Sequence, residues 1–100
     1  MSEHSDIVLI DTHAHIDYPE YDPDRDAVIT RAREQGVRYI VNVGATLEGS
    51  ARAVEMAKRY PGVYAVVGCH PHDSIDLTDS GFAQIARLSE FPKVVAIGEI

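Results

Sequence analysis

Four short apolar runs alternate with three amphipathic segments, and this alternation constrains the fold more than any other feature of the chain. The apolar runs are rich in Val, Ile and Ala and span residues 7–15, 37–44, 63–68 and 93–100. The segments between them carry apolar side chains at helical spacing. A β-α-β-α-β-α-β order with short connections predicts an α/β fold with right-handed crossovers and a parallel sheet. Continuous apolar strands also predict burial on both faces of that sheet.

Local signals set the expected helix boundaries. The pair Asp22-Pro23 predicts the N-cap and first residue of a helix that continues to about Gln35 and stops at Gly36. Thr46 predicts the N-cap of the second helix. The third helix is expected to follow a polar loop and to carry Phe82 on its apolar face.

The last apolar run reaches Ile100 with no helix and no closing strand after it. A (β/α)8 barrel requires about 250 residues, and a parallel sheet that stops at four strands leaves a bare edge. We therefore expect the parallel (β/α) units of residues 1–100 to form the first half of a TIM-type (β/α)8 barrel, as the N-terminal part of a single domain.

Composition excludes several classes of protein. The net charge of −7 disfavours a basic nucleic-acid platform, although bound metal ions can supply the positive charge that a phosphodiester needs. No apolar run approaches the roughly 20 residues of a membrane span, and residues 1–6 do not resemble a signal peptide. Cys69 is the only cysteine, so no internal disulfide is possible. We expect a cytoplasmic protein without an obligate protein partner.

His13 and His15 are the strongest candidates for metal ligands. Side chains alternate faces along a strand, so residues two apart point the same way. The pair comes at the carboxyl end of the first strand, where barrel enzymes place their active sites. Asp11 and Asp17 are expected to orient the two rings. The alternative is that one ring is packed and the other solvated.

Four further positions follow the later strands. Glu99 closes an apolar strand, where a carboxylate is either paired or metal-bound, or else lies exposed in the next loop. His70 follows the third strand and is either close to the substrate or solvated. The pattern favours a solvated His72 and a packed Cys69.

Three motifs together resemble the TatD family. They are Leu9-Ile10-Asp11-Thr12-His13-Ala14-His15-Ile16-Asp17, Gly68-Cys69-His70-Pro71-His72 and Val95-Ala96-Ile97-Gly98-Glu99-Ile100. The likeness extends from about Ile7 to Ile100. It implies a barrel of the amidohydrolase superfamily that acts as a metal-dependent deoxyribonuclease or phosphodiesterase.

The resemblance also implies roles for individual residues. His13 and His15 would bind one of two divalent metal ions (Mg, Mn or Zn), and Glu99 would bridge both ions and take part in catalysis. His70 would lie near the substrate, which would be DNA or another phosphodiester. Two alternatives stay open. One is another amidohydrolase-type enzyme that cleaves an amide, lactone or phosphoester, and the other is a non-catalytic barrel fragment.

Overall fold

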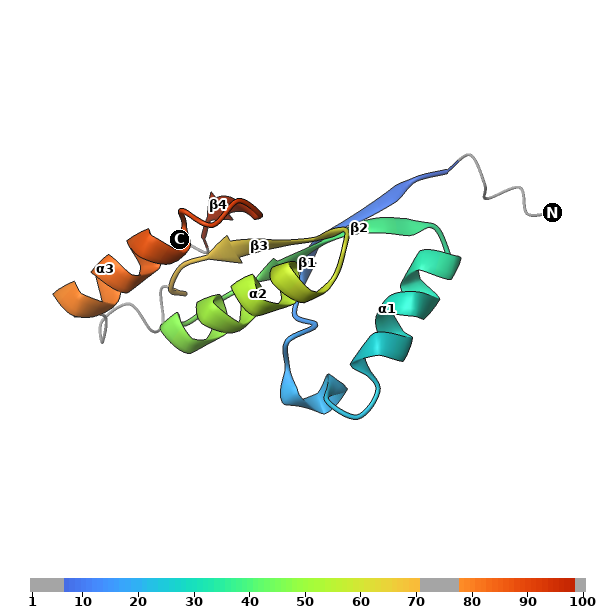
Figure 1. Cartoon of the computed structure of the whole chain (residues 1–100), viewed down its shortest axis with the longest axis horizontal. Coiled ribbons are helices and arrows are strands. Elements are labelled where there is room, and N and C mark those ends of the chain that lie inside the picture. Colours follow the sequence, from blue (N-terminus) through green and yellow to red (C-terminus); the bar gives the residue numbers. More distant parts are fainter. Residues whose placement is uncertain (1–6, 71–77, 99–100) are drawn as a thin grey trace.

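Strands and helices alternate along the chain (Figure 1), and the computed structural model describes residues 7–70 and 78–98. The elements are, in order, β1 (Leu9–Ala14), the 3-10 helix η2 (Pro19–Tyr21), α1 (Arg25–Glu34), β2 (Val37–Val43), α2 (Leu47–Arg59), β3 (Val63–Val67), α3 (Asp79–Leu88) and β4 (Val94–Ile97). The four strands form one sheet in the order β1-β2-β3-β4, and every neighbouring pair is parallel. The predicted parallel α/β architecture is confirmed.

The parallel order brings the carboxyl ends of the strands to one edge of the sheet. Ala14 at the end of β1 pairs with Asn42 of β2, and Val43 pairs with Val66 of β3. The segments that follow β1, β2 and β3 therefore leave the sheet side by side. In barrel enzymes this edge carries the active site.

The first helix begins later than predicted. Asp22 continues the turns of η2, since its backbone N–H donates to the Pro19 carbonyl at 3.0 Å, and Asp24 takes the N-cap position of α1. The Asp22 side chain accepts from Arg25 instead of capping the helix. The end of the helix is as predicted, because Gly36 follows it with a φ of 98° that only glycine adopts freely.

The second helix is fixed at both of its ends. Thr46 Oγ1 accepts the backbone N–H of Gly49 at 2.9 Å, which confirms the predicted N-cap. At the other end, Lys93 Nζ donates to the carbonyls of Ala57 and Tyr60, and the Tyr60 carbonyl also accepts the backbone N–H of Val63 at 3.2 Å. Burial lowers the pKa of the Lys93 ammonium below its usual value.

Two apolar clusters lie between the helices and one face of the sheet. The first joins α2 and α3 to β3, and the second joins α1 to β1, β2 and the end of α2. Val63, Ala65 and Val67 alternate along β3 and are almost fully buried against the helices. The helices therefore cover one face of the sheet.

Burial of the outer strands differs from the prediction. Ile10 on β1 is 57% exposed, and Val95 and Ile97 on β4 are 57% and 59% exposed. Both strands lie at edges of the sheet, and the described helices cover only one of its faces. Burial on both faces requires a layer on each side, so the expected two-sided burial is wrong for these strands in the described part of the chain.

Candidate functional site

The two predicted ligands lie next to each other where β1 ends. His13 is the fifth residue of the six-residue strand, and His15 follows its last residue. Their ring centroids are 5.1 Å apart, with the ring planes at 78°. This proximity agrees with the period-two prediction that both rings lie on the same side of the strand. His13 is exposed and His15 is half-buried, so solvent reaches the pair.

The His15 ring is held by contacts from two directions. Its Nδ1 atom is 2.9 Å from the carbonyl oxygen of Val43 on β2, and its face stacks on Tyr18 with the centroids 4.7 Å apart and the planes at 13°. A carbonyl oxygen can only accept, so Nδ1 carries the proton. The Nε2 atom of the neutral ring then keeps its lone pair, which is the form that binds a metal.

The aspartates next to the histidines have hydrogen-bond partners of their own. Asp11 Oδ1 accepts the backbone N–H of His13 at 3.1 Å and so binds the main chain. Asp17 is 4% exposed, and its two carboxylate oxygens accept from Asn42 and Arg52. The Val43 carbonyl orients the His15 ring, and the predicted role of Asp17 as its acceptor is wrong.

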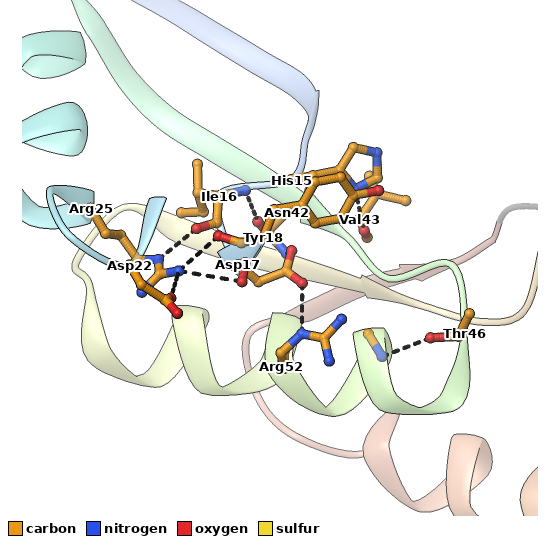
Figure 2. Close-up of polar contacts among 11 residues, drawn as sticks. His15, Ile16, Asp17, Tyr18, Asp22, Arg25, Asn42, Val43, Thr46 and Arg52 are labelled. Atoms are coloured by element: carbon orange, nitrogen blue, oxygen red, sulfur yellow. Dashed lines mark hydrogen bonds and ion pairs between the residues drawn. The ribbon is translucent and has the colours of Figure 1, made fainter. Parts of the chain in front are cut away.

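A buried polar network supports the backbone beneath the histidines. Figure 2 shows Asn42 between the backbone of Ile16 and the carboxylate of Asp17, with Arg52 reaching Asp17 from α2. Asn42 Oδ1 accepts the Ile16 N–H at 2.6 Å, and its Nδ2 donates to Asp17 Oδ1 at 2.8 Å. Asn42 was not among the residues predicted from the sequence. The signal was present, because one amide in an apolar strand must find partners once it is buried.

A second clamp fixes the loop that follows. Arg25 at the start of α1 donates from Nε to the Ile16 carbonyl at 2.6 Å and from Nη2 to the Tyr18 carbonyl at 3.0 Å. Its Nη2 also pairs with Asp22 at 2.6 Å. This one guanidinium therefore satisfies several backbone groups between β1 and η2. The loop that carries Tyr18 is held against the start of α1.

His70 lies at the same edge of the sheet, after β3. Its backbone N–H donates to the Ala45 carbonyl at 2.7 Å. Gly68, two residues before His70, is held by the Ser50 hydroxyl, which accepts from the Gly68 N–H and donates to the Gly68 carbonyl, both at 2.9 Å. Strand β2 separates β3 from β1, so His70 is two strands away from the histidine pair.

Glu99 and His72 lie outside the described residues. Within residues 7–70 and 78–98, no three His, Cys, Asp or Glu side chains lie close enough to hold a metal ion together. The chemistry of the described pair still fits one, because His15 presents an imidazole nitrogen fixed in its metal-binding form beside a second imidazole. His13 and His15 would supply part of a ligand shell.

Two further features concern the length of the helices and the single cysteine. None of the described helices is both long and apolar enough to cross a bilayer. Cys69 is a half-buried free cysteine.

Comparison with known proteins identifies relatives along nearly the whole chain. The chain is 46% identical over 93 residues to YabD of Bacillus subtilis, which is described as an uncharacterized metal-dependent hydrolase; the match covers 93% of this chain and 36% of YabD. It is 41% identical over 91 residues to the 3'-5' ssDNA/RNA exonuclease TatD of Cronobacter turicensis, a match over 91% of this chain and 35% of that protein. The chain thus spans a little over a third of the length of these relatives.

Two crystal structures share the fold. YJJV, a TatD homologue from Escherichia coli K12, superposes with a TM-score of 0.80 at 36% identity, over 92% of this chain and 36% of that one. A TatD family hydrolase from Entamoeba histolytica gives a TM-score of 0.84 at 26% identity, over 93% and 37% of the two chains. The four-stranded parallel sheet therefore corresponds to the first half of the TatD barrel. The family model described as TatD related DNase matches residues 10–100, and the chain belongs to this family.

Proposed function

We propose that this chain forms the N-terminal part of a single-domain metal-dependent hydrolase that cleaves phosphodiester bonds in DNA. The observation that carries the proposal is the His13–His15 pair at the carboxyl end of β1. Because Nδ1 of His15 donates to the Val43 carbonyl, the lone pair of Nε2 is available to bind a metal. The names of the relatives, a metal-dependent hydrolase and a 3'-5' ssDNA/RNA exonuclease, support the same reaction class.

In this proposal each predicted residue has a distinct task. His13 and His15 would hold a divalent ion, and Glu99 would be a ligand shared with a second ion. A divalent metal bound there would lower the pKa of a bound water and neutralise charge on the phosphoryl oxygens. His70 lies on the same edge of the sheet, where it contacts the substrate or moves a proton. We also propose that the protein is cytoplasmic.

The test uses the whole protein, stripped of metal and then supplied with Mg²⁺, Mn²⁺ or Zn²⁺. Hydrolysis of single-stranded DNA is measured for the wild type, for the double variant His13→Ala with His15→Ala, and for Glu55→Gln on the exposed side of α2 as a control. We expect metal-dependent cleavage that the double variant loses and the control keeps. Unchanged activity in the double variant would exclude the proposed ligands.

The substrate class needs its own comparison. YabD, which shares more sequence identity with this chain than the Cronobacter turicensis TatD does, is described as a metal-dependent hydrolase without a stated substrate. Amide, lactone and phosphomonoester substrates are therefore assayed alongside DNA. Metal-dependent turnover of one of these, with intact DNA, would keep the ligand assignment and replace the substrate. Metal binding without turnover of any substrate would favour the non-catalytic alternative.

A further inference from the structure

Asn42 occupies a position where an apolar residue would be expected. It lies in β2 between Val41 and Val43, and its side chain is completely buried. A buried amide without partners is costly, and an aliphatic side chain would pack there without that cost. Both ends of the Asn42 amide are instead bonded, to Ile16 and to Asp17. The residue therefore serves a specific set of contacts.

The orientation of the Asn42 amide is determined by its partners. The ionised carboxylate of Asp17 can only accept, so it must face Nδ2, and the Ile16 N–H can only donate, so it must face Oδ1. Arg52 fixes Asp17 in turn, with its Nε 3.1 Å from Oδ2. A continuous chain of hydrogen bonds therefore runs from the surface of α2 through Asp17 and Asn42 to the Ile16 N–H.

This chain of bonds ends at the peptide group that follows His15. Ala14 is the last residue of β1 that pairs with β2, and beyond it the Asn42 side chain binds the Ile16 N–H. The next residue of β2, Val43, binds the His15 ring through its carbonyl. Two consecutive residues of β2 thus hold His15, one through its ring and the other through the peptide bond on its C-terminal side.

We propose that Asn42 is a positioning residue for His15, which keeps Nδ1 of the ring on the Val43 carbonyl and so leaves Nε2 as the atom that would bind the metal. The inference rests on the proposed function in one respect, since the metal is part of that proposal. The hydrogen bond between Asn42 and the backbone N–H of Ile16, the residue after His15, is independent of it. Loss of outer partners of this kind lowers metal affinity by roughly 10–100-fold.

The experiment compares two variants of the whole protein with similar losses of stability. Asn42→Leu removes both hydrogen bonds at nearly constant volume. Val63→Ala is the matched control, because Val63 is 1% exposed and is the first residue of β3, which β2 separates from the strand that carries the histidines. Thermal unfolding of both variants gives the stability loss against which the other measurements are compared.

Two measurements separate a positioning role from a structural one. Calorimetric titration with Mn²⁺ is expected to show a dissociation constant raised about 10-fold or more in Asn42→Leu and unchanged in Val63→Ala. Long-range ¹H–¹⁵N spectra of the metal-free protein are expected to show a single His15 tautomer, protonated at Nδ1, in the wild type and Val63→Ala. Asn42→Leu should show a mixture of tautomers.

The outcomes distinguish this proposal from the proposed function. If Asn42→Leu matches Val63→Ala in both measurements, the positioning role is wrong. If the variant lacking both histidines binds Mn²⁺ like the wild type, the metal assignment fails, and the His15 spectra of the metal-free protein still decide the role of Asn42.

A milder variant keeps the test valid should Asn42→Leu fail to fold. Arg52→Met removes the outer end of the chain of hydrogen bonds, and the Arg52 side chain is 47% exposed. It should weaken Mn²⁺ binding in the same direction, whereas Arg59→Met at the far end of α2 should not. Equal Mn²⁺ affinity in these two variants and in the wild type would overturn the proposal.

Discussion

The ring of His15, just past the end of the first strand, donates from Nδ1 to the backbone carbonyl of Val43 on the second strand, over 2.9 Å. A backbone carbonyl in a sheet is a rigid acceptor, and it keeps its position whatever side chain its own residue carries. The tautomer of a candidate ligand is therefore set by the sheet itself.

His70→Ala should lower turnover without weakening metal binding. If His70 contacts the substrate or moves a proton, its loss should reduce kcat/KM on single-stranded DNA by about 100-fold. The Mn²⁺ affinity should stay unchanged, because His70 is two strands away from His13 and His15. Cys69→Ala is the neighbouring control and should keep near wild-type activity. A loss of Mn²⁺ affinity in His70→Ala would instead make this residue a ligand.

Gly68→Ala should be strongly destabilising, whereas Gly98→Ala should be tolerated. A Cβ on Gly68 would lie 1.8 Å from the Gly98 carbonyl oxygen, so β3 and β4 would have to separate. A Cβ on Gly98 would lie 3.6 Å from the nearest atom of Val66, an ordinary contact. We expect a loss of about 3 kcal/mol for the first variant and a change within about 0.5 kcal/mol for the second. Urea denaturation measures both, and equal losses would contradict the close approach.

Thr46→Ala should cost about 1 kcal/mol of stability, because it removes the side-chain acceptor of the Gly49 N–H at the start of α2. Thr30→Ala, at an exposed position within α1, is the matched control and should change stability by less than about 0.5 kcal/mol. Denaturant midpoints of the two variants give the comparison. An unchanged midpoint in Thr46→Ala would show that the cap does not contribute to stability.

Tyr60 should make stability sensitive to alkaline pH. Burial raises the pKa of its phenol above the usual 10.0, and the hydrogen bond from its hydroxyl to Asp26 raises it further. The folded state then holds the proton at pH values where the unfolded chain releases it. This contribution to stability is fully present below pH 10 and is lost as the pH rises through the raised value.

The measurement compares wild type and Tyr60→Phe by denaturant unfolding at several pH values. The wild type should be more stable below pH 10 by the contribution of the hydrogen bond, and this difference should shrink as the pH rises above 10. Comparison with phenylalanine cancels the titration of other groups. A difference that stays constant across this range would contradict the raised pKa.

The predictable part of the structure is the part encoded within short stretches of sequence. Apolar runs and their spacing predicted the parallel sheet, and single residues such as Thr46 and Gly36 predicted helix ends, because a cap or a positive φ depends on local chemistry. The spacing of His13 and His15 also predicted their shared side of β1, since alternation along a strand is a local property.

The remainder depends on partners far apart in the chain. Asp17 is bonded to Asn42 and to Arg52, which are 25 and 35 residues away, and no local pattern indicates such pairs. The acceptor for His15 is the backbone carbonyl of Val43, and because every residue has such a carbonyl, the sequence does not indicate this contact. The exposure of Ile10 was mispredicted for a related reason, since burial depends on what covers a strand as well as on its own composition.

Arg52 gives this arrangement a consequence for how such proteins diversify. Its side chain is about half exposed, yet it is the outermost member of a series of hydrogen bonds that reaches the residue next to a candidate ligand. Substitutions on the outer surface of α2 can therefore alter the geometry of an inner site without replacing any residue that lines it. Substitutions at position 52 could therefore change the metal preference during selection. A library randomised at this position would test such changes while leaving both histidines intact.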